Sequence, residues 1–220
     1  MRHKGLFITF EGPDGSGKST VLSKVYEVLK SKNYSFHIDI TREPGGRNNV
    51  IAEDIRNILL NKIEYKISPR AEALLFAASR AQHVQDFIKP NLEQNHLVLC
   101  DRYIHSSLAY QGYARKLGAE EIWNINTFAI NGVLPDLTIV LMLNPEKGIE
   151  RIHKSKLHEF NRLDQEEMNV HQLVYDGYQQ IINEDQHKTL VKIDATKKIE
   201  EVCNEILKII TNKIKEHYGE

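Results

Sequence analysis

A glycine-rich octapeptide near the start of the chain has the residue types that bind a phosphate chain. Its sequence is Gly12-Pro13-Asp14-Gly15-Ser16-Gly17-Lys18-Ser19, which fits the pattern G-x-x-x-x-G-K-[ST]. Glycines allow the tight turns that point several backbone N–H donors inward. Lys18 would reach the β- and γ-phosphates of a nucleotide, and the Ser19 hydroxyl would hold Mg²⁺. The alternative interpretation is an ordinary glycine-rich turn.

Asp101 and Arg102 are a pair of charged residues that follows the apolar run at residues 97–100. An aspartate at a strand end beside a phosphate loop suits the network of ligands around Mg²⁺. An arginine can clamp a phosphate through two parallel hydrogen bonds. The pair therefore predicts phosphate handling at this strand end, and a structural Asp–Arg ion pair is the alternative.

Phe76 and Arg80 are four residues apart in a segment expected to be helical, so they share one helix face. An aromatic ring to stack on and a guanidinium to donate to an exocyclic oxygen can together recognise a pyrimidine by its face and its edge. Taken alone, Phe76 is more simply explained as a core residue.

Two further segments carry charges next to predicted strands. In Thr41-Arg42-Glu43-Pro44-Gly45-Gly46 the proline and glycines favour a turn that presents Arg42 and Glu43, and a plain turn is the alternative. The basic stretch at residues 151–162 follows the fourth predicted strand and could be a solvated helical face. Ligands of open α/β sheets bind outside the carboxyl ends of the strands. We therefore expect a lid over bound phosphates at about residues 151–164.

The elements that position these residues follow from the apolar runs. Short, nearly continuous runs predict strands at residues 5–11, 36–41, 97–101, 137–143 and 190–194. Helices are expected at about residues 17–33, 48–61, 69–95, 119–131, 165–186 and 197–217. Ser68 and Pro69 are expected to begin the third helix as its N-cap and first residue. The alternation predicts an α/β fold, with a five-stranded parallel sheet flanked by helices.

Composition narrows the class of protein. The 220 residues suit a single domain, and 29 Lys and Arg against 30 Asp and Glu leave a formal net charge of −1. That balance favours neither nucleic-acid binding nor a membrane surface. We expect no signal peptide and no membrane span, because the apolar runs are too short. Cys100 and Cys203 lie in no metal or redox spacing, which fits a reducing cytoplasm.

Together these segments resemble the bacterial thymidylate kinases (dTMP kinases). The resemblance rests on the phosphate loop, T-R-E-P-G-G at residues 41–46, F-A-A-S-R-A-Q-H at 76–83, D-R-Y-x-x-S-S-L-A-Y-Q-G at 101–112 and R-L-D-Q-E at 162–166. It spans roughly residues 5–217. It implies a three-layer phosphate-loop kinase fold with a short lid. It also implies Mg²⁺-dependent phosphoryl transfer from ATP to dTMP, giving dTDP and ADP for dTTP synthesis, by a cytoplasmic homodimer.

The resemblance implies roles for residues that handle the phosphates. Arg102 would hold the 5′-phosphate of dTMP, and Asp101 would order the metal and its water. Asp14 would contact the acceptor or the metal. Arg42 and Glu43 would lie beside the acceptor, with Arg42 near its phosphate.

It also implies roles around the nucleoside. Phe76 would stack on thymine, and Arg80 would donate to its O4, which disfavours cytosine because cytosine carries an amino donor at that position. Ser107 and Tyr110 would line the nucleoside pocket, although some members have asparagine at the Ser107 position. Tyr110 would pack against the deoxyribose and leave no room for a 2′-hydroxyl.

The chain departs from part of the family at two positions. Some members carry a catalytic arginine where this chain has Gly15, and relatives often have threonine where it has Arg47, which we leave unassigned. With Gly15, the resemblance implies a catalytic cation from the lid. The candidates are Arg151 and Arg162, with Lys154 and Lys156 behind them. Glu166 or its neighbour Glu167 would join the metal or acceptor network, and the sequence does not choose between them.

Two other functions are compatible with the phosphate loop. A kinase for another nucleoside monophosphate or for a deoxynucleoside would share the phosphate loop, and the Phe76 and Arg80 pair argues against it. A GTP-dependent switch or binding module would need a guanine-reading motif. Asn61-Lys62-Ile63-Glu64 resembles N-K-x-D only superficially, because it ends in Glu and lies well before the strand where that motif belongs.

Overall fold

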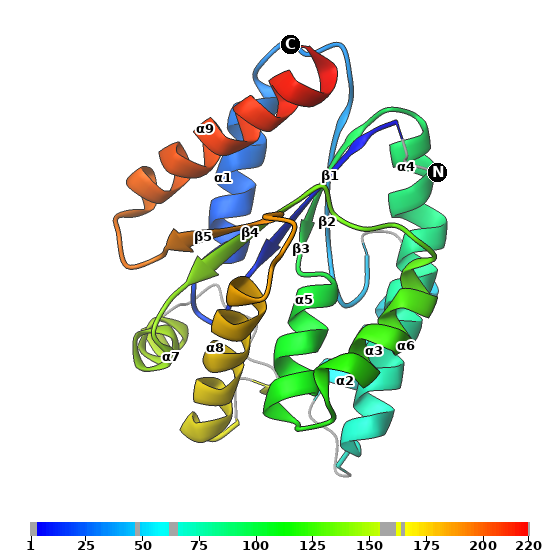
Figure 1. Ribbon diagram of the computed structural model, residues 1–220, viewed down its shortest axis with the longest axis vertical. Coiled ribbons are helices and arrows are strands. Elements are labelled where there is room, and N and C mark those ends of the chain that lie inside the picture. The colour runs from blue at the N-terminus through cyan, green and yellow to red at the C-terminus, as the bar shows by residue number, and fades with distance from the viewer. Residues whose placement is uncertain (1–3, 47–48, 62–65, 155–161, 164–165, 220) are drawn as a thin grey trace.

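Five parallel strands form one sheet in the computed structural model, which describes residues 4–46, 49–61, 66–154, 162–163 and 166–219. The strands are β1 (Leu6–Glu11), β2 (Ile38–Arg42), β3 (Leu97–Asp101), β4 (Leu137–Met142) and β5 (Leu190–Asp194). Their order across the sheet is β2-β3-β1-β4-β5 (Figure 1). The loop that follows β1 therefore leaves from the centre of the sheet.

The strand register brings the ends of three strands to one edge of the sheet. Asp101 of β3 is opposite both Phe10 of β1 and Arg42 of β2. Glu11, the last residue of β1, is opposite Val140 of β4. Ligands of open parallel sheets bind at this edge, where the strand order reverses. The segments that follow Glu11, Arg42 and Asp101 therefore meet at the expected place for a ligand.

Helices cover both faces of the sheet and give three layers (Figure 1). One face packs against α1 (Lys18–Lys30) and α9 (Ile199–Tyr218). The other packs against α3 (Pro69–His83), α4 (Lys89–Glu93), α5 (Ile104–Ser107), α6 (Ala119–Ile130) and α8 (Met168–Asn183). α2 (Val50–Leu60) lies against α3, and α7 (Pro145–Lys154) follows β4. Among the described helices, none has the length and apolar character needed to cross a bilayer.

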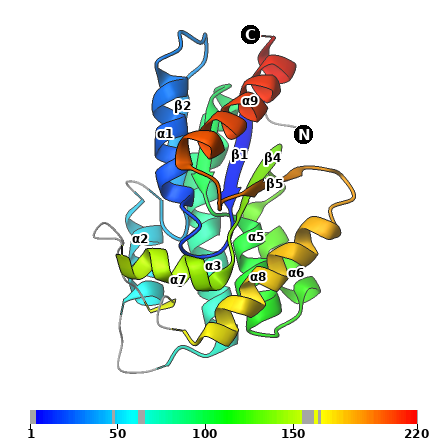
Figure 2. The ribbon, with the colours of Figure 1, turned by 90° about the vertical axis from the view of Figure 1, so that its left-hand side faces the viewer.

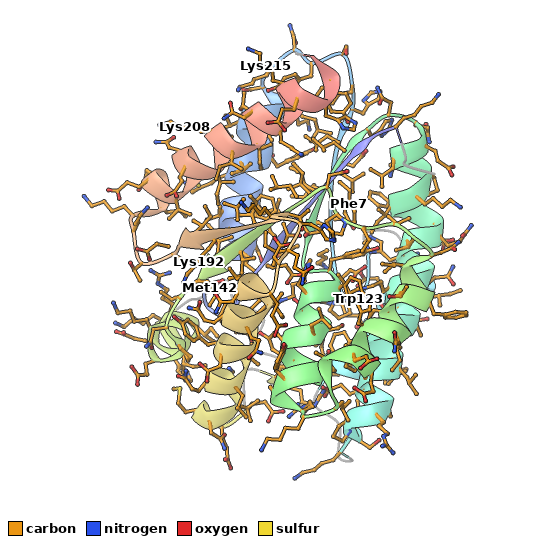
Figure 3. All side chains as sticks on the ribbon, viewed as in Figure 1. Phe7, Trp123, Met142, Lys192, Lys208 and Lys215 are labelled. Atoms are coloured by element: carbon orange, nitrogen blue, oxygen red, sulfur yellow. The ribbon has the colours of Figure 1, made fainter. Side chains whose placement is uncertain are left out.

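Alternate strand residues point to the two helical layers, and both sets are buried. Ile8 packs with the side chains of α1 and α9, whereas Phe7 packs with the opposite layer. Met142, at the end of β4, is buried within the molecule (Figure 3). By contrast, Lys208 and Lys215 extend from the outer side of α9, away from the sheet. Burial on both faces explains why the strands are continuous apolar runs rather than alternating ones.

The structure confirms the predicted α/β fold and places each strand within two residues of its predicted bounds. The helix predicted at residues 69–95 begins as expected, with the Ser68 hydroxyl accepting from Ala71 N at 3.4 Å. It is not one continuous α-helix, because Val84–Ile88 forms a π-helical segment before α4. Pro90 has no N–H to donate, and the helix widens immediately before it.

Two helical elements were not predicted from the sequence. α7 begins directly after β4, where Asn144 Oδ1 accepts from Glu146 N at 2.9 Å and Pro145 is the first helical residue. Asparagine followed by proline is a helix-start signal, but it does not show in the apolar runs. The second is α5 with the π-helical segment Leu108–Ala114. Each part is too short for helical periodicity to reveal it.

Candidate active site

The loop between β1 and α1 has the conformation that glycine allows. Gly12, Gly15 and Gly17 have φ angles of 136°, 72° and 89°, which side chains disfavour. Gly17 is the N-cap of α1, and no described side chain caps the first N–H groups of that helix. A helix start with free N–H donors and its positive dipole end favours a phosphate group.

Lys18, the first residue of α1, folds back over this loop. Its Nζ donates to the carbonyl oxygen of Pro13 at 2.9 Å and lies 3.5 Å from Ser16 Oγ. The side chain is buried. Burial, together with the charge of Arg102, lowers the pKa of Lys18 to about 8, although nearby carboxylates act in the opposite direction. A phosphate chain in the loop would supply the counter-charge that this ammonium group lacks.

α7 packs directly against the phosphate loop (Figure 2). A Cβ atom added to Gly15 would lie 2.1 Å from the carbonyl oxygen of Gly148, and one added to Gly148 would lie 2.5 Å from that of Asp14. Both distances are far below contact distance, so neither position has room for a side chain. The close approach gives a physical reason for Gly15 where some thymidylate kinases have arginine.

Ser19 and Asp101 meet at the mouth of the loop. The Ser19 hydroxyl donates to Asp101 Oδ2. Asp101 Oδ1 is buried and has no hydrogen-bond partner within the described ranges. A buried carboxylate oxygen without a partner, beside a hydroxyl, fits the ligands of Mg²⁺, which binds few protein groups and completes its shell with water and phosphate. The residues present therefore fit the metal implied by the phosphate loop.

Arg102 lies between the phosphate loop and the expected acceptor site. It has a positive φ of 69°, an uncommon conformation for a residue with a side chain. Its guanidinium donates to the Gly12 carbonyl, Asp14, Ser106, Tyr110 and Tyr178. It also lies 5.2 Å from the centre of the Tyr110 ring. Contacts from three segments hold the guanidinium at the carboxyl ends of the strands.

Burial and the charge of Arg102 act in opposite directions on the pKa values of two nearby carboxyls, Asp14 and Glu11. Burial alone would raise the pKa of Asp14, but the positive charges of Arg102 and Lys18 and a hydrogen bond from Tyr110 outweigh it and lower that pKa. Burial raises the pKa of Glu11, against hydrogen bonds from neighbouring donors. Asp14 is thus an anion in direct contact with Arg102.

Arg80 of α3 is held in a fixed orientation. Its exposed fraction is 2%. Four of its five N–H groups donate, to Glu43 at 2.6 Å, Ser107 at 3.0 Å, the Tyr103 carbonyl at 2.9 Å and Asn126. The fifth N–H, on Nη2, has no hydrogen-bond partner among the described residues. Glu43 also accepts from His83 at 3.1 Å, so the T-R-E-P-G-G turn is tied to α3 and its residues are not a plain surface turn.

One cavity of about 590 Å³ joins these groups. Its volume is in the usual range for small-molecule sites. The phosphate loop and strand ends contribute Asp14, Gly15, Gly17, Lys18, Ser19, Arg42, Glu43, Asp101 and Arg102. The helical layer contributes Phe76, Arg80, Ser107, Tyr110, Gln111 and Arg151. The structure thus brings together residues that the sequence analysis selected in five separate segments.

The lid candidates are in different places. Arg151 of α7 lines the cavity and donates to the Ala195 carbonyl at 3.1 Å. Arg162 is not among the described lining residues and instead donates to Glu72 at 2.6 Å. Lys154 pairs with Glu150 on the exposed side of α7. Lys156, Arg47 and the centre of the lid lie outside the described residues, as do Lys62 and Glu64 of the N-K-x-E segment.

Several site residues were not found from the sequence. Glu11, fully buried, accepts from Tyr103 N at 2.7 Å, Ser106 Oγ at 2.5 Å and Tyr178 OH at 2.9 Å. Glu11 is an acidic residue that ends an apolar strand, a signal that could have been used. Tyr178, far along the chain, gives no local signal. Gln111 lines the cavity and belongs to the quoted D-R-Y segment.

Three other residues that the sequence singled out, Arg42, Glu166 and Glu167, lie in different surroundings. Arg42 pairs with Glu53 at 3.1 Å and lines the cavity. Of the two neighbouring glutamates, Glu166 pairs with Arg115 at 2.5 Å, whereas Glu167 is the N-cap residue of α8. Glu166 contacts a smaller pocket behind Tyr110 rather than the main cavity.

The fold has three layers around a parallel sheet, and a phosphate loop follows the central strand. The cavity holds a second cationic group, Arg102, besides Lys18 of the loop. These features are those of a phosphate-loop kinase that acts on small substrates. The thymidylate kinase family model matches residues 10–206. A thymidylate kinase of Finegoldia magna is 51% identical over 206 residues, covering 92% of this chain and 98% of the relative. One of Bacillus pumilus is 46% identical over 213 residues, covering 97% and 98%.

The similarity extends to three dimensions. The crystal structure of a thymidylate kinase from Ehrlichia chaffeensis superimposes with a TM-score of 0.73 at 30% identity, covering 94% of this chain and 98% of that one. The chain belongs to the thymidylate kinase family, and it is a phosphotransferase.

Proposed function

We propose that this chain transfers the γ-phosphoryl group of ATP to the 5′-phosphate of dTMP, giving dTDP and ADP on the route to dTTP. The observation that carries the proposal is that one cavity is lined by Lys18, by Arg102 and by the Phe76 and Arg80 pair. A donor at the loop and an acceptor at α3 would meet phosphate to phosphate. That alignment is what in-line transfer requires.

The phosphate loop is the proposed donor site. Lys18 would exchange the Pro13 carbonyl for oxygens of the β- and γ-phosphates, and the first N–H groups of α1 would donate to the same chain. The residues assigned to the triphosphate are Gly12, Pro13, Asp14, Gly15, Ser16, Gly17, Lys18 and Ser19.

The lowered pKa of Lys18 predicts an alkaline limit to ATP binding. Below pH 8 the free enzyme carries the charged ammonium, and above pH 8 it loses that charge. We expect kcat/KM for MgATP to fall by about tenfold per pH unit above that point. A Lys18→Arg variant, which stays charged, should lack this limb in its residual activity. A wild-type profile that stays flat to about pH 9.5 would contradict the assignment.

Ser19 and Asp101 are the proposed Mg²⁺ residues, Asp101 partly through water. The bound ion would neutralise charge on the β- and γ-phosphates. Asp101 Oδ1, buried and without a partner among the described residues, supports this assignment.

The acceptor site is proposed at the other end of the cavity. Arg102 would grip the 5′-phosphate, with Arg42 beside it and Asp14 as the anion that orients Arg102. Glu43 and Ser107 would act mainly by fixing Arg80, to which both are hydrogen-bonded. Tyr110, held by its bond to Asp14 at 2.6 Å, would pack against the sugar.

The base would be read by its face and its edge. Phe76 would stack on the ring, and the remaining N–H of Arg80 would donate to O4 of thymine. Gln111 donates its Nε2 to Glu72 at 3.0 Å. Within the described part of the chain its amide oxygen has no hydrogen-bond partner, so it would accept from a donor such as N3–H of the ring. Cytosine presents an amino donor and a ring acceptor at these two positions, so it would leave Arg80 and Gln111 unpaired.

A panel of acceptors scored by ADP release tests the function. We expect kcat/KM for dTMP to exceed that for dCMP, dGMP and thymidine by at least about a hundredfold, because a site built to hydrogen-bond a ligand rejects analogues that leave its polar groups unpaired. dTMP no better than these acceptors would favour another nucleotide or nucleoside kinase. Tight GTP binding without transfer to any monophosphate would favour a switch.

The acceptor phosphate is already a nucleophile, so catalysis would rest on alignment and charge stabilisation rather than on a strong general base. Lys18 and Arg102 supply two fixed cations. Arg151 is the proposed lid cation, because it lies on α7 beside the phosphate loop and lines the cavity. Arg162, the other candidate, is hydrogen-bonded to Glu72 and to the end of α2 instead.

We further propose that the chain acts as a single cytoplasmic kinase domain, with a lid at about residues 151–164, and forms a homodimer through α3 and its neighbours. Exposed apolar side chains lie on three helices that pack side by side. They are Ile58 of α2 at 50%, Leu74 of α3 at 57% and Phe128 of α6 at 91% exposed. Large apolar side chains exposed on neighbouring helices favour burial in a partner interface. Sedimentation of the purified protein measures the assembly directly.

A further inference from the structure

A cluster of charged side chains joins the base-reading helix α3 to residues near the predicted lid. Its centre is Glu72, in the first turn of α3, whose side chain is 1% exposed. Glu72 Oε1 accepts from Gln111 Nε2 at 3.0 Å and from Arg115 Nε at 3.2 Å. Glu72 Oε2 accepts from Arg162 Nη2 at 2.6 Å and from Arg115 Nη2 at 3.4 Å. One buried carboxylate thus binds side chains from two other segments.

Arg162 is also bound to the end of α2. Its backbone N donates to the Leu60 carbonyl at 3.1 Å, and its Nε donates to the Leu59 carbonyl at 3.0 Å. The last carbonyls of a helix have no partner within the helix, so Arg162 satisfies groups that α2 leaves open. These contacts tie α2, α3 and the chain at Arg162 into one unit.

The cluster has as many negative as positive side chains. Arg115 also pairs with Glu166 at 2.5 Å, so two carboxylates face two guanidinium groups. Burial alone would raise the pKa of Glu72, but hydrogen bonds and charge from Arg115, with Gln111 and Arg162, lower it. Glu72 is therefore an anion at neutral pH. Its neutralisation would leave two largely buried cations short of a counter-charge, which is more damaging than loss of an exposed pair.

The cluster borders the cavity at the acceptor end. Glu72 is one helical turn before Phe76 and two turns before Arg80, on the same side of α3. Three residues bound to the cluster or adjacent to it line the cavity: Leu60, Gln111 and Leu163. Leu60 accepts from Arg162, Gln111 donates to Glu72, and Leu163 follows Arg162 in the chain. Part of the cavity wall is therefore held in place by contacts of Glu72 and of its partner Arg162.

We infer that Glu72 is a positioning residue for the acceptor site: it holds Arg162, Arg115 and Gln111 so that the cavity wall around the base keeps its shape. The inference rests on the proposed function. It separates the two lid arginines, because Arg162 acts as an anchor of the wall whereas Arg151 faces the cavity near the phosphate loop.

Steady-state kinetics of Glu72→Gln test the inference. We expect KM for dTMP to rise by between about tenfold and a hundredfold, since small displacements of positioning groups have effects of this size. KM for ATP and kcat should change by about threefold or less, because the donor site is at the other end of the cavity. Titration calorimetry with dTMP alone should show the same loss of affinity without any turnover.

Two further variants separate positioning from general loss of stability. Arg162→Met removes the arginine that pairs with Glu72, and Arg162 is the more exposed of the two side chains. This variant should also raise KM for dTMP. The double variant should be no worse than the more affected single variant by more than about twofold, because both changes remove one interaction. Ile210→Ala, which opens a cavity on the opposite face of the sheet, should lower Tm without changing KM for dTMP.

The results that would contradict the role of Glu72 differ from those that would contradict the proposed function. Glu72→Gln with unchanged affinity for dTMP, or with equal rises in both KM values, overturns the inference. A large loss of kcat in Arg162→Met at saturating substrates with normal KM makes Arg162 a catalytic cation and overturns it too. A wild-type chain that binds dTMP without phosphorylating it contradicts the proposed function alone, because the calorimetric comparison still tests Glu72. A wild-type chain that does not bind dTMP contradicts both.

Discussion

Replacing Lys18 by methionine should lower kcat for phosphoryl transfer to dTMP by about a thousandfold. Nζ of Lys18 lies over the phosphate loop, within hydrogen-bond distance of a carbonyl that a phosphate would displace. Methionine has a similar length and no charge, so the variant loses stabilisation of the charge on the transferring group. Burial already disfavours the ammonium form in the free protein, as the lowered pKa of Lys18 shows. The free energy of unfolding should therefore not fall.

The matched control is Lys24→Met, which removes an exposed lysine from the same helix. Its kinetic constants should equal those of the wild type. The measurement is kcat at saturating ATP and dTMP, with Tm recorded for both variants. A Lys18→Met enzyme with near-normal kcat would remove the phosphate loop from the mechanism, and with it the proposed donor site.

Replacing Arg102 by alanine should lower kcat/KM for dTMP by about a hundredfold to a thousandfold. The guanidinium lies beside Asp14 and is held by hydroxyl groups of Ser106, Tyr110 and Tyr178. Its loss removes the clamp for the acceptor phosphate. It also removes one of the two positive charges that lower the pKa of Asp14, so that pKa should rise. Both changes weaken the acceptor site more than the donor site.

Two control variants test whether the loss comes from the guanidinium of Arg102 itself. Arg102→Lys keeps the charge but not the planar fork, so it should recover part of the loss and no more. Arg70→Ala removes an exposed arginine from the start of α3 and should have no effect. The split between KM for dTMP and KM for ATP is the readout. If Arg102→Ala raised KM for ATP and left KM for dTMP unchanged, the assignment of the two ends of the cavity would be reversed.

Local sequence pattern was enough to predict the five strands, most of the long helices and much of the site. The phosphate loop is contiguous, and its glycines, Lys18 and Ser19 act within eight residues, so their arrangement follows from turn chemistry and a helix start. The strands are apolar because both faces are buried, and this is visible without knowing their neighbours. Phe76 and Arg80 share a helix face by spacing alone, and both line the cavity.

Contacts between distant residues could not be predicted in this way. Tyr178 and Glu11 are 167 residues apart, and Arg162 and Glu72 are 90 apart. The types of these residues are equally compatible with exposed helical positions. The sequence named Arg151 and Arg162 as equal lid candidates, and only the packing of α7 against the loop and of Glu72 against Arg162 distinguishes their surroundings.

The sequence by itself determined where the five strands lie along the chain, the phosphate loop, and the Phe76 and Arg80 pair expected to bind a base. Each of these depends on residues close together in the chain. The tertiary structure alone decided that Arg80 is fixed by Glu43 and Ser107, and that Glu72 joins the wall of the cavity. A buried charge is placed by partners from other elements, since only their combined hydrogen bonds offset the cost of taking it out of water.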